Sequence, residues 1–214
     1  MDLLHTFVDM FLHLDKHLVE IVAQYQYWTY GILFAIVFAE TGLVVTPFLP
    51  GDSLLFAVGT LSASSEVLRL EYLFPLLLAA VFLGDNTNYW LGRTVGPKIF
   101  SRDDVKLFNK KHLDRTHAFF ERYGPKAVIM ARFVPIVRTF MPFVAGIGAM
   151  PYPRFLAFSV AGCLLWLCIC MFAGFFFGAL PIVKKNFSLV VLAIIFISIL
   201  PAVIEIMRSR KEGH

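Results

Sequence analysis

Two apolar stretches of this chain are interrupted by prolines and also carry charged side chains, which an ordinary membrane-spanning helix does not. Glu40 and Asp52 belong to the first stretch, and Arg132 and Arg138 belong to the second. An isolated charge at the middle of a bilayer costs roughly 2.5–3.5 kcal/mol on insertion scales. Four unpaired charges would cost about 10–14 kcal/mol, which is comparable with the stability of a whole domain. These side chains must therefore pair, face water or hold a ligand.

The composition is that of an integral membrane protein. Hydrophobic residues make up 58% of the chain and charged residues 16%, whereas soluble domains average about 45–50% and about 25%. We therefore predict an all-α membrane protein with a single membrane domain over residues 1–214. The net charge of +4 is concentrated in one loop and the C-terminal tail. That distribution indicates orientation in a membrane rather than nucleic-acid binding.

Four stretches are long and apolar enough to span a bilayer, which takes about 20 residues. They are residues 28–45, 72–91, 155–180 and 187–207. Residues 1–24 place acids and histidines among apolar residues at helical spacing, which predicts an amphipathic interfacial helix. His5, Asp9, His13 and His17 recur every four residues, but a solvated polar face is favoured over a metal site there, and we expect no bound metal or cofactor.

Two further apolar stretches, residues 47–63 and 127–150, contain residues that interrupt helices and are predicted to be re-entrant hairpins. The expected helix-breaking residues are Pro47, Pro50 and Gly51 in the first hairpin and Pro135, Pro142 and Gly146 in the second. One hairpin falls in each half of the chain, residues 28–91 and 127–207. This pattern predicts an inverted repeat with a transport site between the halves.

The charge distribution predicts the orientation. Residues 92–126 contain nine lysines and arginines, so this loop is expected in the cytoplasm, as are both termini. The two hairpins then enter the membrane from opposite faces. Lys184 and Lys185 fall on the outside in this arrangement and count against it.

The two arginines are candidates for binding a phosphate. On an unbroken helix, Arg132 and Arg138 would point to different faces, but Pro135 lies between them and ends that helix. Both guanidiniums could then converge on one anion, because arginine binds phosphate oxygens in pairs and stays charged. The alternatives are that the arginines reach the membrane surface or pair with acids.

The acids are candidates for proton coupling or gating. A carboxyl group in a low-dielectric site holds its proton more tightly, which suits Glu40 and Asp52 to take up and release a proton. Asp52 also follows Pro50-Gly51 and precedes an apolar run, so it is equally a candidate N-cap. Asp85 and Tyr89 lie in a polar patch of residues 72–91. They could line a pathway, or Asp85 could pair with an arginine.

The sequence contains no catalytic constellation, so we expect a protein that is not an enzyme. The strings around Glu40-Thr-Gly, Pro50-Gly-Asp52, Gly84-Asp85 and Arg132-Phe-Val-Pro-Ile-Val-Arg138 resemble the DedA family, whose SNARE-associated or VTT domain also occurs in eukaryotic lipid scramblases. The resemblance covers nearly the whole chain. It implies a multi-pass protein of the bacterial inner membrane that moves phosphate-bearing lipids.

The substrate that the resemblance implies is undecaprenyl phosphate or a phospholipid, with movement coupled to protons. By motif, the family's functional acids fall on Glu40 and Asp52 and its arginines on Arg132 and Arg138. Homo-oligomer formation stays open. The rival hypothesis is a proton-coupled antiporter of small cations or drugs, which would use the acids but leave the arginines without a function.

Overall fold

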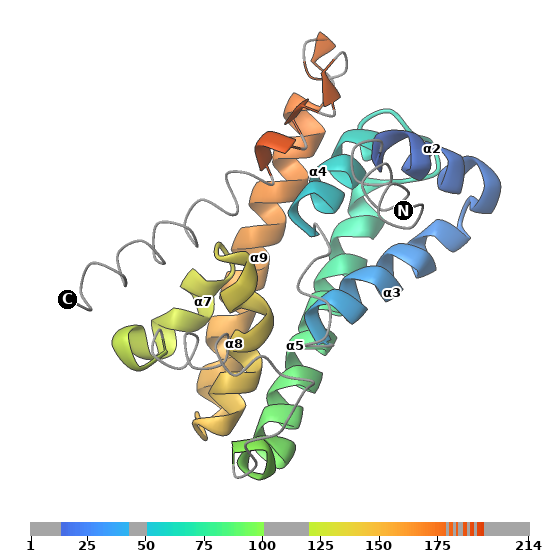
Figure 1. Ribbon diagram of the computed structural model, residues 1–214. Coiled ribbons are helices and arrows are strands. Elements are labelled where there is room, and N and C mark those ends of the chain that lie inside the picture. Colours follow the sequence, from blue (N-terminus) through green and yellow to red (C-terminus); the bar gives the residue numbers. More distant parts are fainter. Residues whose placement is uncertain are drawn as a thin grey trace, which may run out of the picture.

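The computed structural model describes residues 14–42, 51–100 and 120–178, and ten positions between 180 and 194. Within these residues the structure is helical, as the sequence predicts (Figure 1). In chain order the elements are α2 (Leu14–Tyr25), α3 (Trp28–Gly42), α4 (Gly51–Ser62), α5 (Leu70–Phe100), the 3-10 turn η1 (Gly124–Lys126), α7 (Ala127–Ala131), α8 (Pro135–Ile147) and α9 (Tyr152–Phe177).

Two helices in the described part of the chain are long and apolar enough to cross a membrane, Leu70–Val95 within α5 and Tyr152–Phe177, which is α9. They confirm two of the four predicted spans. Helix α5 continues through Pro75 and Asp85 and ends at Phe100, so the first part of the predicted loop 92–126 is helical instead.

The other predicted spans are covered in part. Of the predicted span 28–45, residues 28–42 are described and form α3, an apolar helix of 15 residues that begins at the predicted residue. Helix α2 confirms the amphipathic N-terminal helix from residue 14 onward. Most of residues 187–207, the loop 101–119 and residues 43–50 lie outside the described residues.

The second broken segment confirms a break at Pro135. Helix α7 ends at Ala131, and α8 begins at Pro135 after a short turn. Val134 is extended, with φ −121° and ψ 102°, as a residue before proline prefers. Proline is favoured at the first position of a helix because the missing N–H would have no partner there. The break therefore follows directly from the sequence.

Pro142 and Gly146 do not break the helix, contrary to the prediction. Helix α8 continues through both residues to Ile147. Pro142 cannot donate to the carbonyl of Arg138 four residues earlier, but packing against α5 holds the helix together. Gly146 serves that packing, because a Cβ there would lie 2.1 Å from the carbonyl oxygen of Tyr89.

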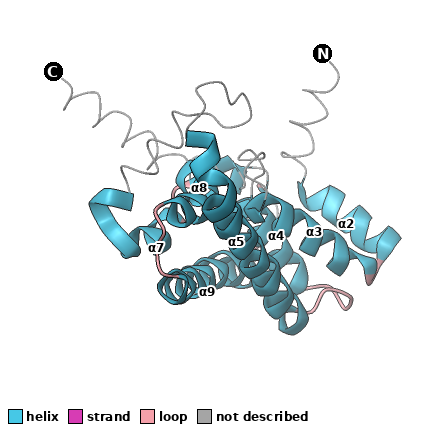
Figure 2. Ribbon diagram, turned by 90° about the horizontal axis from the view of Figure 1, so that it is seen from below, coloured by secondary structure: helices cyan, strands magenta, loops and turns pink. Residues whose placement is uncertain are grey.

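The short helix of each half packs against the long helix of the other half. Helix α4 lies along α9, and α8 lies along α5 (Figure 1). Both contacts are close: a Cβ on Gly59 or Gly174 would lie 2.2 or 2.1 Å from a carbonyl oxygen of the facing helix, and one on Gly92 would lie 2.1 Å from such an oxygen. Figure 2, viewed along the bundle, shows α2 and α3 beside this core. This packing of each short helix on the other half fits an inverted repeat. The re-entrant course of the hairpins stays a prediction.

The outer surface of the helices is apolar. Tyr25, Tyr27 and Trp28 are exposed where α2 meets α3, and Trp28 is 78% exposed. Exposed leucine, isoleucine and phenylalanine side chains also lie along α9. Large exposed apolar surfaces of this kind mark contact with a membrane or partner, and aromatic residues favour the membrane interface. The surface therefore agrees with a bilayer environment.

Candidate functional site

The charged residues selected from the sequence lie inside the helix bundle. Glu40, Asp85, Arg132 and Arg138 are between 1% and 8% exposed, and the side chain of Asp52 is 17% exposed. They form two separate groups. Each group contains one arginine from the second half and at least one acid from the first half.

The first group, the Arg138 cluster, consists of Arg138, Glu40, Asp52 and Trp166. Nη2 of Arg138 donates to Glu40 Oε1 at 2.6 Å, and Nη1 donates to Asp52 Oδ1. Trp166 Nε1 donates to the same Asp52 oxygen at 2.8 Å. The Arg138 guanidinium carbon lies 4.9 Å from the centre of the Trp166 ring, a cation–π distance. Both terminal nitrogens of Arg138 are therefore engaged by carboxylates.

Three helix ends bring this cluster together. Glu40 lies in the last turn of α3, Asp52 in the first turn of α4, and Arg138 in the first turn of α8. Asp52 lies inside α4, in its first turn, and not at the N-cap position before the helix that the sequence also suggested. The helix dipole still stabilises a carboxylate in the first turn. A Cβ on Gly51 would lie 2.4 Å from Glu40 Oε2, so only glycine leaves room for this carboxylate. Glu40 Oε2 itself has no hydrogen-bond partner among the described residues.

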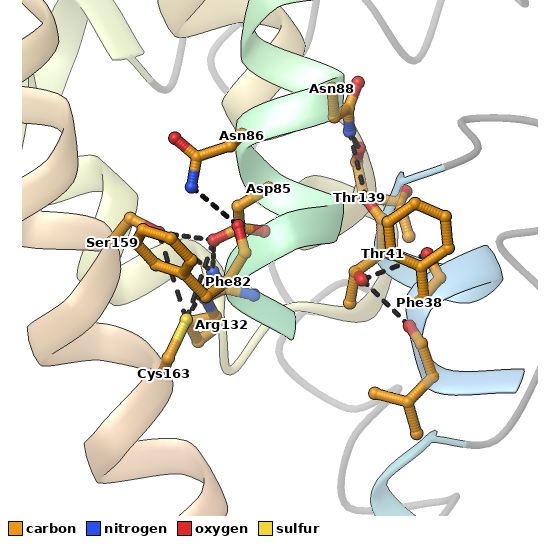
Figure 3. Close-up of polar contacts among 11 residues, drawn as sticks. Phe38, Thr41, Phe82, Asp85, Asn86, Asn88, Arg132, Thr139, Ser159 and Cys163 are labelled. Atoms are coloured by element: carbon orange, nitrogen blue, oxygen red, sulfur yellow. Dashed lines mark hydrogen bonds and ion pairs between the residues drawn. The ribbon is translucent and has the colours of Figure 1, made fainter. Parts of the chain in front are cut away.

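The second group, the Arg132 cluster, consists of Arg132, Asp85, Ser159 and Cys163 (Figure 3). Nη2 of Arg132 donates to Asp85 Oδ2 and approaches Cys163 Sγ at 3.0 Å. The Ser159 hydroxyl donates to the same Asp85 oxygen. Asp85 comes from α5, Ser159 and Cys163 come from α9, and Arg132 follows α7. The ion pair therefore joins the two halves of the chain.

The structure separates the two arginines, which the sequence analysis allowed to converge on one anion. They share no hydrogen-bonded partner among the described residues, because Asp85 engages Arg132 while Glu40 and Asp52 engage Arg138. Pairing with acids, one of the alternatives considered for the arginines, is what this structure contains. For Asp85 the ion-pair alternative is confirmed. Glu40 and Asp52 both contact Arg138, and their role in proton coupling stays a prediction.

Tyr89 has a packing position rather than a place in either cluster. Its hydroxyl donates to the Met150 carbonyl and accepts from Arg93 Nη1 at 3.0 Å. Its ring stacks on Phe155, with ring centres 4.4 Å apart. These contacts join α5 to Phe155 of α9 and to Met150 just before it. The pathway role considered for Tyr89 stays a prediction.

Sequence reasoning missed four polar contributors. Trp166, Ser159 and Cys163 lie in an apolar helix, where the pattern gives no signal. Asn88 donates to the Thr139 carbonyl at 2.7 Å and to the Thr41 carbonyl at 3.3 Å, which ties α5 to α8 and α3. Figure 3 shows this contact on the other side of α5 from Asp85.

Pro47 and Pro50 lie outside the described residues. Among the residues that the structure describes, no three His, Cys, Asp or Glu side chains are grouped to hold a metal ion.

The comparisons with known proteins agree with these features. The VTT domain matches residues 49–176, which contain Asp52, Asp85 and both arginines. The chain is 52% identical to Protein DedA of Escherichia coli K12 over 214 residues, covering 100% of this chain and 98% of that protein. It is 47% identical over 187 residues to an uncharacterized membrane protein of Mycobacterium tuberculosis H37Rv, covering 86% of this chain and 82% of that protein.

The chain is also 34% identical over 172 residues to the inner membrane protein YghB of E. coli K12, covering 80% of this chain and 75% of that protein. The search of solved structures found no match. With a VTT domain over more than half its length and relatives that align over nearly all of it, the chain belongs to the DedA family of membrane proteins.

Proposed function

We propose that the protein is a transporter of phosphate-bearing lipid that returns undecaprenyl phosphate from the outer to the inner leaflet of the bacterial cytoplasmic membrane. Membership of a family of membrane proteins supports a role in membrane transport. The observation that carries the proposal is the Arg138 cluster, a buried arginine held by two carboxylates at the meeting point of three helix ends.

A phosphate monoester can replace these carboxylates. Arginine donates in a planar fork that matches the oxygens of carboxylates and phosphates alike. In the cluster, the carboxylate oxygens of Glu40 and Asp52 accept from Nη2 and Nη1 of Arg138, in the positions that phosphate oxygens would take. The single guanidinium offsets one of the two carboxylate charges, and a bound proton would offset the other. Protonation of Glu40 or Asp52 weakens its hold on Arg138 and frees donors for the lipid phosphate.

The antiporter hypothesis is less well supported by the geometry. A cation at Glu40, Asp52 or Asp85 would meet a carboxylate that already pairs with an arginine, and it would lie beside that positive charge. An incoming anion instead finds the arginines already in the interior, where an uncompensated phosphate charge would be costly. The arginine pairs therefore favour an anionic substrate.

Reconstitution tests the proposal directly. We expect the wild-type protein in proteoliposomes to translocate labelled undecaprenyl phosphate and to do so faster when an imposed pH gradient supplies protons from the side of the lipid. Undecaprenol, which lacks the phosphate, and protein-free liposomes are the controls. Equal movement of the phosphate and the alcohol would contradict the proposal.

The proposed orientation is testable in cells. We propose a multi-pass protein with both termini in the cytoplasm and with hairpins 47–63 and 127–150 that do not cross. Single cysteines placed in residues 104–118 should resist a membrane-impermeant thiol reagent in intact cells and react after lysis, because the basic loop stays inside. Labelling of these cysteines from outside would overturn the orientation.

A further inference from the structure

The two buried arginines differ in how much of each guanidinium is occupied. Arg138 uses both terminal nitrogens, Nη1 for Asp52 and Nη2 for Glu40. Within the described residues, the side-chain hydrogen bonds of Arg132 all start from Nη2, which reaches Asp85, Ser159 and Cys163. The donors on Nε and on Nη1 of Arg132 are therefore used by no described residue.

The occupied corner of Arg132 is firmly held. Asp85 is 1% exposed and accepts from both Arg132 and the Ser159 hydroxyl. Gly162, on the same helix as Ser159, faces the arginine stem, and a Cβ there would lie 3.3 Å from Arg132 Cγ and 3.7 Å from Nε. Helix α9 therefore also packs closely against the stem. A guanidinium fixed through Nη2 holds its Nη1 donors in a defined direction.

We propose that Asp85 is a positioning residue that holds Arg132 through Nη2, so that the Nη1 donors receive the lipid phosphate before Arg138 leaves Glu40 and Asp52. The inference rests on the proposed function and adds an order of events to it. Arg132 binds the phosphate first. Arg138 joins only after proton uptake by the carboxylates that occupy it.

The titratable groups that face Arg138 are the ones whose protonation can release it. Glu40 comes from α3, Asp52 from α4, and the Cys170 thiol of α9 is the third titratable group near this cluster. Asp85 and Cys163 face Arg132 instead. Because the carboxylates of the two clusters are different, the first binding step and the proton-dependent step are separable by mutation.

Trp166 provides a reporter for the second step, since its ring lies over the Arg138 guanidinium and contacts Asp52. The chain has three tryptophans, and Trp28→Phe with Trp90→Phe leaves Trp166 alone. Farnesyl phosphate is the probe, and farnesol is its phosphate-free control. In alkaline buffer we expect farnesyl phosphate to bind the full-length protein without changing Trp166 emission. In acidic buffer the same binding should change the emission.

Asp85→Asn should weaken farnesyl phosphate binding about tenfold in both buffers, the effect of one misdirected charge-assisted bond. The pH at which Trp166 responds should stay unchanged. Ser159→Ala keeps the ion pair but removes one bond to Asp85, and it should weaken binding by a smaller factor of about two to five. This second variant decides the question if Asp85→Asn does not fold.

Asn88→Ala is the matched control, because it removes a buried polar contact from the same helix, one turn away. It should leave the affinity unchanged. The inference is overturned if Ser159→Ala binds like wild type, or if Asn88→Ala reproduces the loss. A wild-type protein that does not prefer farnesyl phosphate to farnesol would instead refute the proposed function.

Discussion

Arg138→Lys is expected to lower undecaprenyl phosphate transport by about 10- to 100-fold. A lysine ammonium is a point charge, so it cannot reproduce the fork that reaches Glu40 and Asp52 together or lie flat on the Trp166 ring. The loss of one charge-assisted hydrogen bond costs about 1.5–3 kcal/mol, which gives the stated factor. Initial rates in proteoliposomes measure the effect.

Arg69→Lys is the matched control, because Arg69 pairs with Glu71 at the surface, where the two side chains are 59% and 54% exposed. That exchange should leave transport within about twofold of wild type, since surface pairs contribute little. Equal transport by Arg138→Lys and wild type would show that guanidinium geometry is irrelevant. Arg138→Ala should destabilise the fold by about 3–5 kcal/mol, because it leaves buried carboxylates without their partner.

Glu40→Gln and Asp52→Asn are each expected to abolish transport and to flatten its dependence on pH. Both changes keep the shape of the side chain but remove its titration. In Glu40→Gln the amide oxygen still accepts from Arg138, and the amide nitrogen takes the place of Oε2, which has no hydrogen-bond partner among the described residues. Binding of the lipid phosphate should survive, because both arginines remain. Transport at several pH values, with and without a pH gradient, measures the effect.

Glu71→Gln provides the matched control, because it neutralises an exposed carboxylate that also pairs with an arginine. It should keep the wild-type pH profile. If both buried variants transport like wild type with an unchanged profile, Glu40 and Asp52 have a structural role and proton coupling is wrong.

The break before α8 was predictable from residues 132–135 because it is a local effect. Proline at position 135 restricts Val134 to extended backbone and starts a new helix. Pro142 shows the limit of the same rule. It lies inside α8, where packing along α5 compensates for the missing backbone donor, and that packing depends on residues far away in the sequence.

The partners of the charged residues could not be read from the sequence. Asp85 and Arg132 are 47 residues apart, Asp52 and Arg138 are 86 apart, and Glu40 and Arg138 are 98 apart. The cost of burying charge requires that each one pairs, but it does not select the pairs. Trp166, Ser159 and Cys163 gave no signal for the same reason, since their roles depend on what faces α9.

The sequence by itself determined the membrane class, the position of the break before α8 and the set of buried charges, because insertion cost and proline chemistry act locally. Tertiary structure alone decided which acid holds which arginine. The short helix of each half packs on the long helix of the other through glycines that admit close backbone contact. That exchanged packing brings Asp85 to Arg132 and brings Glu40 and Asp52 to Arg138, because long-range helix contacts fix which buried charges meet.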